Sequence, residues 1–166
     1  MIDAVTQSQG GMPEPRRLDL PLLPTGQEER YYLERFMGAF GAGPGETALV
    51  DDPVATWRED RPVLAVARDL FTSHAGKSKL KKAGREVFML YIAATIQAPD
   101  EVWMVGTGQE GATMTRLARF RMGRDLLNVL AVFRRGAKVW SGVTAYQTYD
   151  GTYFNSKRTG NLCYRR

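Results

Sequence analysis

The stretch TMTRLARFRMGRDLLNVLAVFRR, residues 113–135, decides the fold together with KVWSGVTAYQ, residues 138–147, which follows it closely. Side chains of residues 113–122 and 138–147 alternate between two faces, which is the period of a β-strand. Residues 127–133 form a nearly continuous apolar run, which is typical of a central strand covered on both faces. We therefore expect a run of strands in the second half of the chain.

Shorter elements are expected on either side of these strands. Apolar residues recur at spacings of three and four over residues 27–40 and 85–97, which predicts two helices. The remaining predictions are strands over residues 47–50, 63–67, 102–105 and 161–164, and helical turns over 69–73 and 153–158. Helices that precede a run of strands favour an α+β fold, with the N-terminal helices packed on one face of a twisted antiparallel sheet.

The chain has 166 residues, of which 43% are hydrophobic, and this suits a single domain with its own core. Residues 1–24 are rich in glycine and proline and read as a flexible tail or linker, which leaves residues 25–166 as the domain. One cysteine and one histidine exclude an intramolecular disulfide and a zinc cluster. We expect no metal site, no cofactor and no membrane span.

The net charge of +5 is concentrated in two segments, and the first is GKSKLKKAGRE, residues 76–86. Lysines and arginines at this density suit a groove that holds a phosphate chain, although such runs are more often solvated loops. Arg85 begins the second predicted helix, where free backbone N–H groups also favour a phosphate. Lys77, Lys79 and Lys82 are the other candidates for contacts with nucleic acid.

The second basic segment is YFNSKRTGNLCYRR, residues 153–166. Lys157 and Arg158 follow Tyr153 here, and this mixture suits bases that stack while phosphates are neutralised. The plainer interpretation is a final strand with a frayed charged end, which we favour for Arg165 and Arg166.

Two further candidates lie outside the basic segments. Trp140, Gly142, Thr144 and Tyr146 are expected on one strand face, where the Thr144 hydroxyl either bonds a phosphate or only reflects β-propensity. His74 is the one side chain with an ordinary pKa near neutrality, and it lies beside the first basic segment. A lone histidine is more often incidental than catalytic.

Three stretches together resemble a known family: GKSKLKKAGRE running into VFMLYIAATIQAPDEVW, then VWSGVTAY, then YFNSKRTGNLCYRR. The earlier LPLLPTGQEERYYLERFMGAFG resembles the family's leading helix. The family is the phage-associated nuclease domains of the Barnase–EndoU–colicin–RelE superfamily, found at the C-terminus of Mu-like phage head-morphogenesis proteins and in polymorphic toxins. The matching positions are Lys79, Lys82, Arg85, Trp140, Gly142, Thr144, Tyr146, Arg158, Gly160 and Tyr164.

The resemblance implies an α+β fold and a metal-independent ribonuclease, typically a toxin. In such an enzyme the substrate 2′-OH attacks the phosphate, and the product carries a 2′,3′-cyclic phosphate. The protein therefore aligns the 2′-OH with the phosphate, moves protons and stabilises the charge on the phosphate. We expect Arg158 and Arg85 to clamp the phosphate, Thr144 to orient it, and His74 or Tyr146 to move protons. Lys77, Lys79, Lys82, Lys157 and Tyr153 are expected to contact the RNA.

Two rival functions remain, a non-catalytic nucleic-acid-binding module and an assembly domain of a phage head. For a nuclease, the expected partners are RNA, with tRNA among the candidates, and an acidic immunity or antitoxin protein. The expected place of action is the cytoplasm of the target cell, after delivery within a larger secreted or virion-associated protein.

Overall fold

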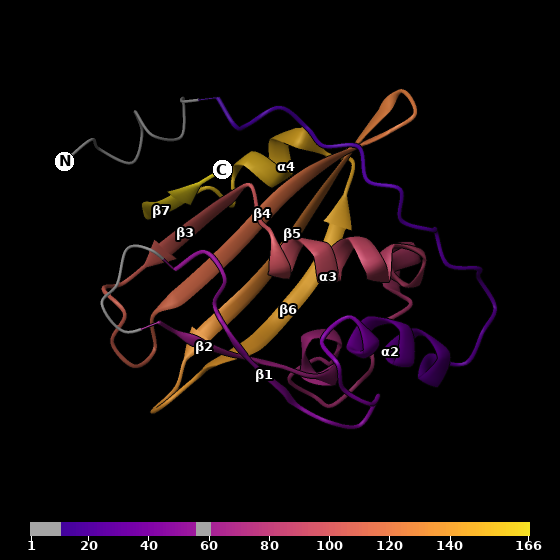
Figure 1. Ribbon diagram of the computed structural model, residues 1–166, viewed down its shortest axis with the longest axis horizontal. Coiled ribbons are helices and arrows are strands. Elements are labelled where there is room, and N and C mark those ends of the chain that lie inside the picture. Colours follow the sequence, from indigo (N-terminus) through magenta and orange to yellow (C-terminus); the bar gives the residue numbers. More distant parts are fainter. Residues whose placement is uncertain (1–10, 56–60) are drawn as a thin grey trace.

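Figure 1 shows the computed structural model of the protein, which describes residues 11–55 and 61–166. The fold is α+β, with a curled seven-stranded sheet in the order β1-β2-β6-β5-β4-β3-β7. The strands are β1 (Ala48–Asp51), β2 (Val63–Val66), β3 (Glu101–Val105), β4 (Thr113–Met122), β5 (Asp125–Arg135), β6 (Trp140–Thr148) and β7 (Asn161–Arg165). The helices are α2 (Glu29–Gly38), α3 (Met89–Gln97), α4 (Gly151–Asn155) and the 3₁₀ helices η1 (Arg68–Phe71) and η2 (Lys82–Phe88).

The three longest strands form the predicted antiparallel meander. β4 pairs with β5 from Thr113 opposite Arg134 to Met122 opposite Asp125, and β5 pairs with β6 along most of its length. The predicted bounds of β4 are confirmed, while β5 extends beyond its apolar stretch at both ends. The meander is the framework on which the shorter elements are placed.

The prediction of a purely antiparallel sheet is wrong at one position. β2 runs parallel to β6, with Leu64 opposite Trp140 and Ala65 opposite Ser141. These two strands are far apart in the sequence, and the whole α3 and β3–β5 region lies between them. Parallel neighbours need such a long crossover connection, which periodicity within each strand does not reveal.

The second helix begins later than predicted. Ala83 and Gly84 have φ angles of 54° and 74°, in the left-handed region that interrupts a helix. Residues 82–88 therefore form 3₁₀ turns, and α3 begins only at Met89. Arg85 consequently lies in the 3₁₀ segment ahead of α3 and not in the first turn of the α-helix. No described helix is both long and apolar enough to cross a bilayer.

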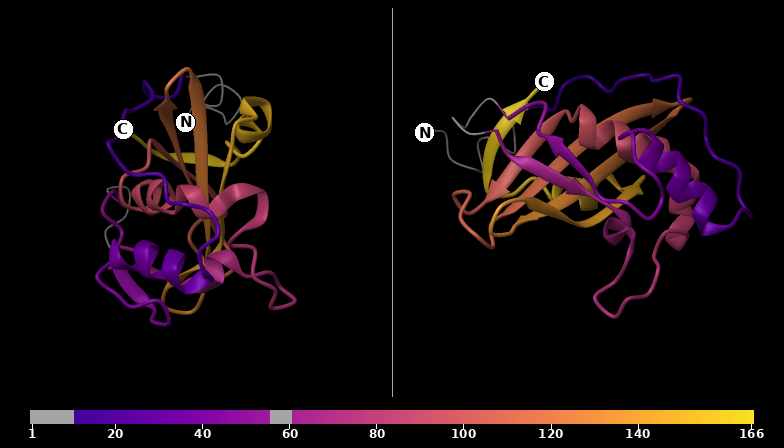
Figure 2. Two further views of the ribbon diagram at one scale, coloured as in Figure 1. Left: turned by 90° about the vertical axis from the view of Figure 1, so that its right-hand side faces the viewer. Right: turned by 60° about the horizontal axis from the view of Figure 1, so that its bottom comes forward.

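Apolar side chains form two cores, one on each face of the sheet. The first core includes Ile92 of α3 together with Ala118 and Phe133, and the second core consists of Trp103, Leu117, Leu130 and Phe154. α4 lies on the face of the sheet opposite α3 in the edge-on view of Figure 2, and its Phe154 is buried in the second core. The helices therefore do not all lie on one face.

Residues 11–24 lie against the domain. The Arg16 N–H donates to the Arg119 carbonyl over 3.2 Å, the Arg121 N–H donates to the Arg16 carbonyl over 2.9 Å, and Leu23 is buried. The predicted flexible tail of residues 1–24 also covers residues 1–10, which lie outside the described residues. The domain boundary at residue 25 stays a prediction.

Two buried carboxylates at the start of β3 bind the arginines of the chain's end. Glu101 accepts from Arg158 Nε over 2.7 Å and from Arg165 Nε over 2.8 Å. Asp100 accepts from Arg166 Nε over 2.8 Å. The prediction that Arg165 and Arg166 form a frayed end is therefore wrong, because both are ion-paired to carboxylates that are fully buried.

Replacing Glu101 with glutamine should lower the free energy of unfolding by about 3–5 kcal/mol, because it leaves buried arginine charge without its carboxylate. Burial alone raises the pKa of Glu101, but the hydrogen bonds from Arg158, Trp103 and Arg165 outweigh it and hold the pKa below its ordinary value. A depressed carboxylate pKa contributes stability above the unfolded pKa and loses it as pH falls through the folded pKa. The variant should thus lose less stability between neutral and acid pH.

Urea denaturation at neutral and acid pH checks this expectation. The matched control is Glu34→Gln, which breaks an exposed ion pair with Arg30 on α2 and should change stability by less than about 1 kcal/mol. Equal losses in the two variants would contradict the structural role of Glu101.

Candidate functional site

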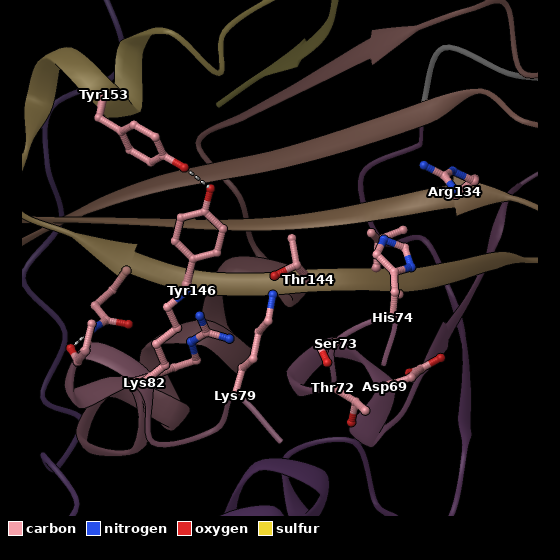
Figure 3. Close-up of a pocket in the computed structure, with 15 residues that line it drawn as sticks. Asp69, Thr72, Ser73, His74, Lys79, Lys82, Arg134, Thr144, Tyr146 and Tyr153 are labelled. Atoms are coloured by element: carbon pink, nitrogen blue, oxygen red, sulfur yellow. Dashed lines mark hydrogen bonds between the residues drawn. The ribbon is translucent and has the colours of Figure 1, made fainter. Parts of the chain in front are cut away.

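A cavity of about 630 Å³ lies between β6 and the segment that contains η1 and η2 (Figure 3). β2 covers the edge of β6 only at Trp140 and Ser141, and within the described chain this pairing goes no further. η1 and η2 pack against the rest of β6, and Gln147 Nε2 donates to the Ala83 carbonyl over 3.0 Å. The cavity therefore opens where β6 has lost its neighbouring strand.

A β-bulge turns the end of β6 into this cavity. Phe133 pairs with Gly142, but the next residue of β5, Val132, pairs with Thr144, so Val143 is the extra residue. Trp140 consequently belongs to the first core, whereas Tyr146 packs against the second. The prediction that Trp140, Gly142, Thr144 and Tyr146 share one face is wrong, because the bulge shifts the alternation by one residue.

Most of the predicted site residues meet in this cavity. Its lining includes Arg85, Thr144, Tyr146, His74, Lys79, Lys82 and Tyr153. In Figure 3 the Lys79 side chain points toward Thr144, and Tyr146 points toward Tyr153. Lys77, Lys157 and Arg158 are not among the lining residues. Lys77 is exposed on the hairpin-like loop closed by the Thr72–Ser78 bridge, which projects from the body in Figure 2.

Arg158 cannot be the phosphate clamp that the sequence predicts. Its Nε and Nη2 donate to the two Glu101 carboxylate oxygens over 2.7 and 3.0 Å, and its guanidinium lies 5.8 Å from the Trp103 ring centroid. Only 7% of Arg158 is exposed. Arg158 thus joins the segment between α4 and β7 to β3, and it lies outside the lining of the cavity.

Arg85 has the opposite environment. It is 6% exposed, and its Nε and Nη1 have no hydrogen-bond partner within the described part of the chain. Its guanidinium lies 5.5 Å from the Tyr146 ring centroid, and burial lowers its pKa, although an arginine stays charged. A buried cation without a partner is costly, and an anion in the cavity would relieve that cost.

Tyr146 is held in its protonated form. Its hydroxyl oxygen lies 2.6 Å from that of Tyr153, and burial together with this hydrogen bond raises the pKa of Tyr146 well above its ordinary value. A phenol with a raised pKa donates hydrogen bonds at neutral pH but is a poor proton acceptor. Because a raised pKa also makes the phenol a weaker acid, the environment of Tyr146 suits hydrogen-bond donation rather than proton transfer.

Sequence reasoning missed several lining residues, chiefly Asp69, Arg134 and Gln147. Asp69 is the single carboxylate among the described lining residues, which also include two lysines and two arginines, and burial raises the pKa of Asp69. The alternation of β5 could have pointed to Arg134, but nothing in the sequence distinguishes Asp69 from other surface acids. In the described ranges no three His, Cys, Asp or Glu side chains gather as metal ligands would.

A comparison with models of protein families shows which family the chain belongs to. Residues 35–165 match the model of the family described as phage-Barnase-EndoU-ColicinE5/D-RelE like nuclease 2. The chain belongs to this family. The family PBECR2 is one of nucleases, and all the lining residues of the cavity lie within the matched range. No curated protein and no solved structure matches the chain.

Replacing Gly142 with alanine should distort the cavity of this PBECR2 domain. The added Cβ would lie 2.5 Å from Leu70 Cγ, so the Leu70 side chain, or η1 with it, must move away from β6. Overpacking of this kind lowers the free energy of unfolding by about 1–3 kcal/mol. Gly45→Ala is the matched control, because its Cβ meets no atom within 4 Å.

Urea denaturation of Gly142→Ala, Leu70→Ala and the double variant checks this contact. The double variant should be more stable than the sum of the two losses predicts, because the shorter side chain makes room for the new methyl group. Strictly additive losses would show that Gly142 and Leu70 do not constrain each other.

Proposed function

We propose that the protein is a metal-independent endoribonuclease in which the substrate 2′-OH attacks the adjacent phosphate and the P–O5′ bond breaks, which leaves a 2′,3′-cyclic phosphate and a 5′-OH that takes up a proton. The observation that carries this proposal is the buried Arg85 in a cavity rich in cations, with its Nε and Nη1 lacking hydrogen-bond partners among the described residues. Transfer of the phosphoryl group from the 5′-oxygen to the 2′-OH needs alignment, proton transfer and stabilisation of charge, all of which side chains can supply.

Each cavity residue has a proposed role in this reaction. Arg85 binds the non-bridging oxygens of the scissile phosphate in place of the predicted pair of Arg85 and Arg158. Lys79 and Lys82 add positive charge, and the Thr144 hydroxyl orients the phosphate. Tyr146 donates a hydrogen bond to a phosphate oxygen. The acceptor of the 2′-OH proton is His74 or Asp69, which lie at the same end of the cavity in Figure 3.

The proposal extends to a biological role. A ribonuclease domain of this kind would act as a toxin on RNA, tRNA included, in the cytoplasm of the target cell. An acidic immunity protein is the partner that an open, positively charged cavity would attract. Growth arrest on expression, relieved by coexpression of such a protein, tests this role.

A non-catalytic nucleic-acid-binding module is the second candidate. The cationic lining favours it over a head-assembly domain, because a packing interface has no need of a buried, unpartnered arginine. A binding module would show salt-dependent affinity for RNA and no cleavage after prolonged incubation. An assembly domain would show neither.

Arg85→Lys should reduce RNA cleavage by roughly a hundredfold or more, because the lysine keeps the charge but loses the planar, bidentate guanidinium. Arg124→Ala, at the exposed turn between β4 and β5, is the control and should leave the rate unchanged. Cleavage rates of a labelled RNA are compared, with circular dichroism as a check of the fold. If Arg85→Lys cuts as fast as the unaltered protein, Arg85 is not the clamp.

The product end distinguishes the reaction class. Incubation with total RNA in EDTA should yield 2′,3′-cyclic phosphate ends, detected by mass spectrometry of digested products. An all-deoxy strand of the same sequence should stay intact, because it lacks the attacking 2′-OH. Dependence on a divalent cation, or efficient cleavage of the all-deoxy strand, would contradict the mechanism.

A further inference from the structure

Two tyrosines are unusually exposed near the cavity. Tyr153 of α4 lines the cavity and is 40% exposed, and Tyr149, just after β6, is 54% exposed. Tyr149 lies between β6 and α4, and Tyr153 lies within α4. Large exposed aromatic rings beside a cationic cavity are typical of surfaces that stack nucleic-acid bases.

The Tyr153 ring is held in place before any ligand arrives. Its hydroxyl is hydrogen-bonded to that of Tyr146, and its backbone N–H donates to the Asp150 carboxylate over 3.0 Å at the start of α4. The neighbouring Phe154 is buried in the second core and anchors the helix. A ring fixed in this way loses little conformational freedom when it binds a ligand.

Positive charge accompanies the same ring. Lys157 Nζ lies over one face of the Tyr153 ring, 4.9 Å from its centroid, so a base would stack on the other face; Lys157 itself does not line the cavity. Tyr149 makes an edge contact with Phe88 at the end of η2, the element that carries Arg85, with ring centroids 6.3 Å apart. The aromatic rings are thus tied to the elements on both sides of the cavity.

We infer that Tyr153 stacks on a base of the bound RNA and thereby restricts the substrate to unpaired nucleotides. The inference rests on the proposed function for the choice of RNA as the ligand. In a duplex the bases are stacked on one another and paired, so a protein ring reaches their faces only where the strand is single or looped. Lys157 would neutralise a phosphate that flanks the stacked base.

Fluorescence anisotropy with a labelled 2′-O-methyl RNA dodecamer tests this inference, because that strand has no free 2′-OH and cannot be cut by the proposed route. The strand is measured alone and annealed to its complement. The unpaired strand should bind at least about tenfold more tightly than the duplex. Tyr153→Ala should weaken binding of the unpaired strand by about fivefold or more, as expected for one lost stacking contact, and leave duplex binding unchanged.

Two variants separate stacking from other effects. Tyr153→Phe keeps the ring and removes the hydrogen bond to Tyr146, so it should bind within about twofold of the unaltered protein. Tyr31→Ala removes a tyrosine of α2 that does not line the cavity, and it should bind as the unaltered protein does. Circular dichroism confirms that each variant is folded.

Equal affinity for strand and duplex, or an equal loss for both in Tyr153→Ala, would overturn the inference. The experiments distinguish a failure of the stacking inference from a failure of the proposed function. A protein that stacks unpaired RNA through Tyr153 but cuts no RNA would contradict the ribonuclease proposal alone. A protein that cuts RNA and shows no loss in Tyr153→Ala would contradict the stacking inference alone.

Discussion

The site depends on the point at which β2 stops pairing with β6. The two strands share two residue pairs, at Trp140 and Ser141, and the bulge at Val143 then turns the remainder of β6. A strand edge without a partner exposes backbone groups that need cover. η1 and η2 provide that cover without continuing the ladder, and the space between them and β6 is the cavity.

The buried arginines of the fold have two kinds of environment. Arg116 is fully buried and donates to Asp52 and to the Ile96 carbonyl, and Arg158 is paired with Glu101. Both have partners within the fold. Arg85 is buried to a similar extent, yet its Nε and Nη1 are without partners within the described residues. Burial of the Arg85 guanidinium costs free energy on folding, and an anionic ligand would recover that cost. Such unfavourable environments are common at functional sites.

Much of the fold could be predicted from the sequence, because the long strands have a strict two-residue period and α2 has a clear helical one. The parallel β2–β6 pair could not, since pairing over a long separation leaves no local signal. The start of α3 was misplaced because the left-handed Ala83 is not a residue type that signals a helix break. For the candidate site, charge density pointed to Lys79, Lys82 and Arg85, which line the cavity, but it could not distinguish Arg85 from Arg158, which does not. That distinction depends on Glu101, which reaches Arg158 only in the folded chain.

The most direct test of the account is a crystal structure of the protein with a non-cleavable RNA, such as a 2′-O-methyl oligonucleotide. The account predicts a phosphate within hydrogen-bond distance of the Arg85 guanidinium and the Thr144 hydroxyl, in the cavity beside β6. An RNA bound along another surface, with the Arg85 cavity free of phosphate, would contradict it.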